Sequence, residues 1–140
     1  MIAGGNGQGS TPDKLNYPWG IYVDSSNTLY VADRSNNRIQ RWDSGAANGI
    51  TVAGDTSGTA GSFSYLLNSP TGVMVDQYGS IYILDSGNTR IQKWTSGATF
   101  GTTVLTTTLS NPLGMGVSAV GNLFIADTNS HRVQSFSVYC

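Results

Sequence analysis

A unit of 25 residues recurs three times in this chain, at residues 18–42, 70–94 and 112–136, with no gap inside any copy. Each copy begins with Pro-x-Gly, carries an aspartate followed five residues later by an arginine, and ends on an aromatic residue. A unit repeated at constant offsets indicates a repeat architecture, in which each copy folds in the same way. The repeated positions are Pro18, Gly20, Asp33, Arg38 and Trp42; Pro70, Gly72, Asp85, Arg90 and Trp94; and Pro112, Gly114, Asp127, Arg132 and Phe136.

The residues between these positions predict β-strands. In each copy, β-branched and aromatic residues alternate between clusters of turn residues, which indicates three short strands. A further apolar stretch follows the first two copies, at residues 50–53 and 102–105. Four short strands that recur every 40 to 50 residues or so are typical of a β-propeller blade. We therefore expect blades at residues 18–54, 70–105 and 112–140, and a surface loop at the connector 55–69, which is rich in Gly, Ser and Thr.

The repeated residues have physical roles in such a blade. We expect the first strand to lie at the crowded central axis, where glycine permits close approach of two backbones. The terminal aromatic residues are expected to wedge between neighbouring sheets. An Asp–Arg pair can bind a substrate, but a residue repeated in every unit usually stabilises the unit itself. We therefore assign the three pairs to fixing the turn between two strands.

The third copy carries a resemblance to a known family. It reads PLG at residues 112–114 and NLFIADTNSHRV at residues 122–133, and this pattern resembles the NHL repeat. The resemblance covers nearly the whole chain and implies a β-propeller, usually of six blades, that serves as a scaffold for binding protein or RNA. One relative is a metal-dependent lyase. The departures are Ser118, which stands where the other copies have Asp24 and Asp76, and the name-giving histidine, which occurs only as His131.

Three blades are fewer than the four to eight that usually close a propeller. The third copy runs to Cys140 without a fourth strand, while residues 1–5 (MIAGG) resemble the outer-strand residues 51–55 (TVAGD). We therefore predict an all-β propeller segment of three four-stranded NHL-like blades. Its third blade lacks the outer strand within this chain, and residues 1–10 provide the outer strand and loop of another blade.

Such a chain would expose two apolar blade faces and an unpaired strand edge, which recruit partners. The predicted function is a non-catalytic structural module whose copies associate head to tail, through strand addition and blade packing. Two copies would close a six-bladed ring, and a rotation that does not close would give a filament. A section of a longer propeller is the alternative. The residues predicted to join two copies are Ile2, Ala3, Gly4, Val133, Phe136 and Val138.

Enzymatic function is not expected, and no catalytic residue, metal ligand or cofactor is assigned. A lyase-like or lactonase-like metal site needs about three protein ligands, and the chain has one histidine, no glutamate and one cysteine. Asp24 and Asp76 follow neighbouring inner strands and are candidates for a calcium site, although a hydrogen-bonded strand end is the preferred interpretation. Trp19 replaces a smaller residue of the other copies and is a candidate contact for another protein or a glycan.

Charge argues against two further partners. Seven Lys and Arg against eight Asp give a net charge of −1, and several of the basic residues belong to the repeated motif, so binding of nucleic acid is not expected. No apolar run approaches the roughly 20 residues of a membrane span, and no signal-peptide pattern precedes the first copy. The compartment stays open between an extracellular location, which we favour, and a cytoplasmic one.

Overall fold

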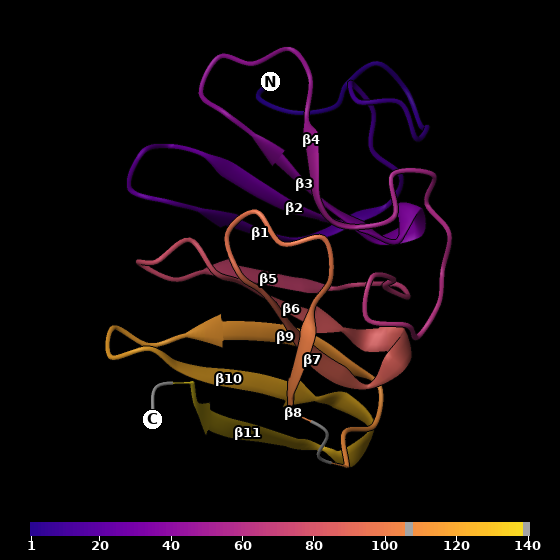
Figure 1. The fold of residues 1–140 in the computed structure, drawn as a ribbon. Coiled ribbons are helices and arrows are strands. Elements are labelled where there is room, and N and C mark those ends of the chain that lie inside the picture. Colours follow the sequence, from indigo (N-terminus) through magenta and orange to yellow (C-terminus); the bar gives the residue numbers. More distant parts are fainter. Residues whose placement is uncertain (106–107, 139–140) are drawn as a thin grey trace.

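A computed structural model describes residues 1–105 and 108–138, and shows three antiparallel sheets stacked one on the next, with the two ends of the chain at opposite ends of the stack (Figure 1). Sheet I has the order β1-β2-β3-β4 and sheet II the order β5-β6-β7-β8. Sheet III contains β9, β10 and β11 in the described part of the chain. The all-β prediction is confirmed. The strands are β1 (Pro18–Val23), β2 (Leu29–Asp33), β3 (Arg38–Trp42), β4 (Ile50–Gly54), β5 (Gly72–Val75), β6 (Ile81–Asp85), β7 (Arg90–Trp94), β8 (Thr102–Leu105), β9 (Pro112–Val117), β10 (Asn122–Asp127) and β11 (Arg132–Ser137).

The turn between the second and third strand of each sheet is more regular than the sequence suggested. It forms a single 3-10 turn, at η1 (Arg34–Asn36), η2 (Ser86–Asn88) and η3 (Thr128–Ser130). The residue after each turn is left-handed, with φ of 52° at Asn37, 50° at Thr89 and 51° at His131. Asparagine tolerates this conformation best among the three residue types.

Apolar side chains pack between the sheets in two clusters. Ile39 of sheet I meets Val73, Ile83 and Trp94 of sheet II in the first cluster. Leu84 and Ile91 of sheet II meet Leu123 and Ile125 of sheet III in the second, with Phe136 packed against its edge. Burying each such side chain contributes about 1.5–3 kcal/mol, so the interfaces between sheets hold the stack together. Trp42 is almost fully buried as well.

The inner strands approach one another closely, because β5 lies between β1 and β9. A Cβ atom on Gly20 would lie 2.3 Å from the carbonyl oxygen of Thr71, and one on Gly72 would lie 2.9 Å from the Cβ of Met115. Glycine is therefore required at these positions for the backbones to meet.

The loops that precede sheets I and II have the same local shape. Gln8 bridges Leu15 as Ala60 bridges Leu67. Residues 1–17 form no strand in the described structure of the single chain. The outer strand predicted for residues 1–10 needs a second chain as its partner and stays a prediction. Residues 139 and 140, the last two of the predicted third blade, lie outside the described residues.

Candidate functional site

The repeated Asp and Arg residues form three equivalent ion pairs. In each pair the arginine Nε donates to the aspartate Oδ2 at 2.8 Å. The pairs are Arg38–Asp33, Arg90–Asp85 and Arg132–Asp127. All three aspartate side chains are fully buried. The arginine side chains are 3% exposed at Arg38, 13% at Arg90 and 47% at Arg132.

Each pair also binds the loop that leads into its own sheet. Arg38 Nη1 donates to the Ser10 carbonyl at 2.8 Å, and its Nη2 donates to the Lys14 carbonyl at 3.2 Å. Asp33 Oδ1 accepts the backbone N–H of Asn16 at 2.7 Å. The same bonds recur 52 residues later, where Arg90 donates to the carbonyls of Ser62 and Leu66 and Asp85 accepts from Asn68. The described hydrogen-bond partners of these guanidinium and carboxylate groups are largely backbone atoms of the loop. The Asp–Arg pair therefore fixes the loop to its sheet.

The carboxylates differ in their environment. Burial raises the pKa of Asp85 above its ordinary 3.8, against the lowering effect of hydrogen bonds from Asn68, Asn88 and Arg90. The pKa of Asp127 instead falls from 3.8 to about 2, chiefly because the Ser110 N–H donates to the charged carboxylate. Sheet II has a sheet on each side of it, and sheet III has one on a single side, so desolvation acts more strongly on Asp85.

The candidate calcium ligands Asp24 and Asp76 instead fold their own turns. Asp24 Oδ1 accepts the backbone N–H groups of Ser26 at 2.8 Å and Thr28 at 2.9 Å. Asp76 Oδ1 binds its turn in the same way, with two N–H donors at 2.9 Å. Within residues 1–105 and 108–138, no three His, Cys, Asp or Glu side chains gather as a metal site would need.

Trp19 lies exposed on β1, with the Arg34 guanidinium 5.1 Å from its ring centroid. This cation–π contact holds the ring on the outer side of sheet I. Ile21 and Val23 lie on the same strand and are also exposed. We call the surface formed by Trp19, Ile21 and Val23 the head face.

The opposite end of the stack presents a second apolar surface, the tail face, formed by Phe124 of β10 and Val133 of β11. Of the residues predicted to join two copies, Val133 lies on this face and Ile2 is exposed near the N-terminus. Phe136 and Val138 instead pack against the cluster between sheets II and III.

Both faces use positions that are buried elsewhere in the stack. Val133 is 69% exposed, whereas its counterparts Ile39 and Ile91 are 0% exposed because the next sheet covers them. Ile21 is 66% exposed, whereas its counterpart Val73 is 6% exposed because the preceding sheet covers it. The tail face and the head face therefore correspond to the two sides of the interface that the chain makes internally.

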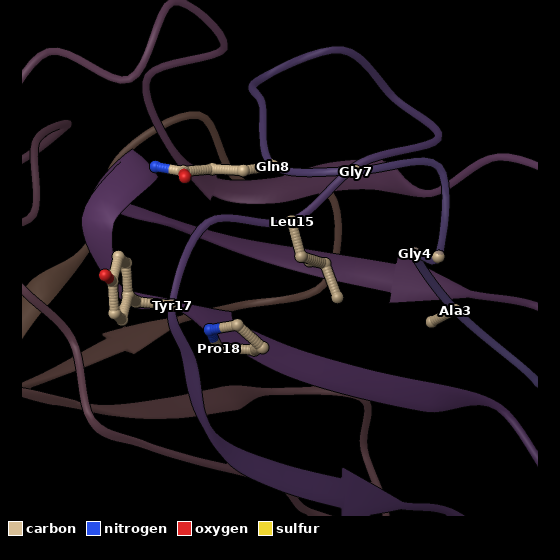
Figure 2. A pocket seen from close by; sticks show the side chains of 8 residues that line it. Ala3, Gly4, Gly7, Gln8, Leu15, Tyr17 and Pro18 are labelled. Carbon is tan, nitrogen blue, oxygen red and sulfur yellow. The ribbon is translucent and has the colours of Figure 1, made fainter.

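A pocket of about 390 Å³ lies beside the head face, where the N-terminal segment meets the start of β1. Figure 2 shows Leu15, Tyr17, Pro18 and Gln8 around it, together with the backbone at Gly4 and Gly7. Most polar groups of this lining belong to the backbone, because glycine, alanine, leucine and proline provide no polar side-chain atoms.

The residues that sequence reasoning missed lie in the turns and loops. Asn36 Nδ2 donates to the Gly9 carbonyl at 2.8 Å, and Asn88 Nδ2 donates to the Gly61 carbonyl at 2.8 Å. Their signal was an asparagine three residues after the repeated aspartate in two of the copies. Leu67 is fully buried in the first cluster although it precedes the repeated unit.

Comparison with known families identifies the repeated unit. The family model described as NHL repeat matches residues 15–42 and 67–94. The chain carries NHL repeats. The resemblance found in the sequence is thereby confirmed for the first two copies, and the matched segments cover β1–β3 of sheet I and β5–β7 of sheet II with the loop residues before them. A comparison with curated proteins gives no match.

Two solved lyase structures have a similar fold. A streptogramin B lyase superposes with a TM-score of 0.60 at 15% identity, over 88% of this chain and 41% of that one. A catalytically inactive virginiamycin B lyase from Staphylococcus aureus with quinupristin gives 0.55 at 19% identity, over 88% and 42%. These identities show the fold alone, which is β-propeller-like. The chain spans about two fifths of the length of these structures.

A search for membrane-spanning helices gives none among the described residues.

Proposed function

We propose that this NHL chain is a non-catalytic interaction module whose copies associate head to tail, each of its three sheets acting as one propeller blade. The observation that supports this is the pairing of the two faces. Ile39 and Ile91 are buried by the next sheet, and the tail face presents Val133 at the same position. A second copy placed with its head face there repeats an interface that the chain already makes twice.

Strand addition completes the same contact. In sheets I and II the third strand is paired on its outer side by β4 or β8. In sheet III β11 is the outer strand, and no strand in the described part of the chain pairs with its outer side. Residues 2–5 resemble β4 in sequence and supply the missing strand from the second copy, through main-chain hydrogen bonds.

The alternative is that the chain is one section of a longer NHL propeller. The same two faces would then be covered by other blades of that polypeptide. The lyase activity named for the structural neighbours does not carry over to this chain, because identities of 15% and 19% support a similar fold only.

A mixing experiment tests the head-to-tail contact. Val133→Asp places a carboxylate on the tail face and leaves the head face intact, and Ile21→Asp does the reverse. Each variant alone is expected to be monomeric by sedimentation velocity, because a charge buried at the junction loses its hydration. An equimolar mixture is expected to form a dimer, since one intact head meets one intact tail.

Val120→Asp serves as the control, because the corresponding turn residue Tyr78 stays exposed in the middle sheet. This variant is expected to associate like the original chain.

A mass of two chains for the original protein indicates a closed ring, and a ladder of larger species indicates a filament. An original chain that stays monomeric at millimolar concentration overturns the proposal, as does a mixture that remains monomeric.

A further inference from the structure

The pocket beside the head face has a counterpart inside the stack, between sheets I and II. Gly4, Gly7 and Tyr17 line the N-terminal pocket and have φ of 69°, 89° and 50°. Gly54, Gly58 and Ser69 occupy the corresponding places in the connector before sheet II, with φ of 83°, 81° and 49°. The two loops therefore share a left-handed backbone at these three places, as well as the bridge noted above.

In the internal counterpart, the pocket is filled by the left-handed turn of the preceding sheet. Asn37 Nδ2 donates to the Gly58 carbonyl at 2.9 Å, and Asn37 Oδ1 accepts the backbone N–H of Ser69 at 2.9 Å. A Cβ on Gly54 would lie 2.5 Å from the Asn37 carbonyl oxygen, and one on Gly58 would lie 3.1 Å from that of Asn36. The turn at residues 36–38 therefore packs tightly against these glycines.

No such turn meets the N-terminal pocket within the described structure. A Cβ on Gly7 would meet nothing within 4 Å, and the three atoms nearest to one on Gly4 all belong to Leu15. The pocket thus has the shape that receives a left-handed turn, and sheet I has no described sheet before it to provide one.

We propose that the turn of a second copy, residues 130–132, occupies this pocket, with His131 in the place that Asn37 takes internally. His131 has the same left-handed backbone, with φ of 51°. A neutral imidazole offers one N–H donor and one nitrogen acceptor from a single planar group, which suits the Gly7 carbonyl and the Tyr17 N–H. This inference rests on the proposed function and adds the residues that set its specificity.

The same placement fixes the register of the added strand. Arg38 pairs with Gly54 and Ile39 with Ala53 in sheet I. The corresponding pairs between two copies are Arg132 with Gly4 and Val133 with Ala3. A slip by one residue would turn the side chains of the added strand to the wrong face.

The experiment measures a single junction. The Ile21→Asp chain, whose tail is intact, is titrated with the Val133→Asp chain, whose head is intact. His131→Gly in the Ile21→Asp chain keeps the left-handed turn and removes the imidazole, so the dissociation constant is expected to rise about five- to thirty-fold. His131→Asn is expected to bind at least as tightly as the histidine, because Asn37 makes both bonds internally.

Asn37→His is the matched control, because it exchanges the same two residue types at the internal junction. It is expected to change the melting temperature and to leave the dissociation constant unaltered. An unchanged dissociation constant for His131→Gly, or an equal loss for His131→Asn, overturns the inference while the head-to-tail contact stands. If the Ile21→Asp and Val133→Asp chains form no dimer, either with His131 or with His131→Asn, the proposed function and the inference fail together.

Discussion

Replacing two of the repeated arginines one at a time tests whether the Asp–Arg pairs hold the fold. Arg38→Met and Arg132→Met each remove one guanidinium and keep most of the aliphatic volume. The two sites differ in burial, since the Arg38 side chain is 3% exposed and that of Arg132 is 47% exposed. The aspartate partner is fully buried at both sites.

The structure predicts a large difference between the two variants. Arg38→Met leaves the Asp33 carboxylate without its ion pair and the carbonyls of Ser10 and Lys14 without a donor. Breaking a buried pair in this way costs about 3–5 kcal/mol. Solvent screens the half-exposed Arg132, and Asp127 keeps hydrogen bonds from Ser110 and Gln134, so its loss costs about 1 kcal/mol or less.

Urea unfolding at low protein concentration measures these free energies. Domains of this size have about 5–15 kcal/mol in total, so Arg38→Met shifts the midpoint far and Arg132→Met shifts it little. Arg41→Met is the control, because Arg41 pairs with Asp43 at the surface. Equal losses for Arg38→Met and Arg132→Met, or a loss at Arg38 below about 1 kcal/mol, would refute the reasoning.

Two further predictions concern the fold. Gly72→Ala is expected to lower the free energy of unfolding by about 1–3 kcal/mol, because the new Cβ would lie 2.9 Å from that of Met115. Gly116→Ala is the matched control, because its new Cβ would meet nothing within 4 Å. Equal losses for the two variants in urea unfolding contradict the close approach of the strands. The folded-state pKa of Asp127, about 2 against 3.8, means that its carboxylate stabilises the fold above about pH 4 and that this contribution is lost as the pH falls through about 2. Stability curves of the original chain and Asp127→Asn are therefore expected to converge between pH 4 and pH 2, and curves that stay parallel there contradict the pKa.

The repeat made the sheets predictable from the sequence. The repeated aspartate and arginine are five residues apart in every copy, so the same turn is predicted three times. The turn residues between each aspartate and its arginine predict that the two flanking strands are antiparallel. The fourth strands were expected at residues 50–53 and 102–105 and lie at Ile50–Gly54 and Thr102–Leu105. Alternation of apolar residues was sufficient here because each strand is short and bounded by turns.

The contacts of the loops were not predictable in the same way. The arginines donate to main-chain carbonyls. Every residue has such a carbonyl, so the sequence does not indicate which one accepts the hydrogen bond. Leu67 was missed as a core residue because the connectors differ in length, and an alignment that begins at Pro70 excludes it. Its signal was a leucine three residues before each repeated proline, at Leu15, Leu67 and Leu109.

The loop contacts also show how the internal interface between two sheets is built, and the proposed contact between copies uses the same parts. Each sheet is tied to the loop that precedes it by its own Asp–Arg pair, so a loop and its sheet form one unit. Asn37 then joins one unit to the next through Gly58 and Ser69. In the proposed head-to-tail contact, Gly7 and Tyr17 of the first unit are the receiving half of this joint, and His131 of the last unit is the inserting half. Because each half is held by bonds within its own unit, the proposed contact needs little reordering of the loops, which lowers the entropic cost of that association.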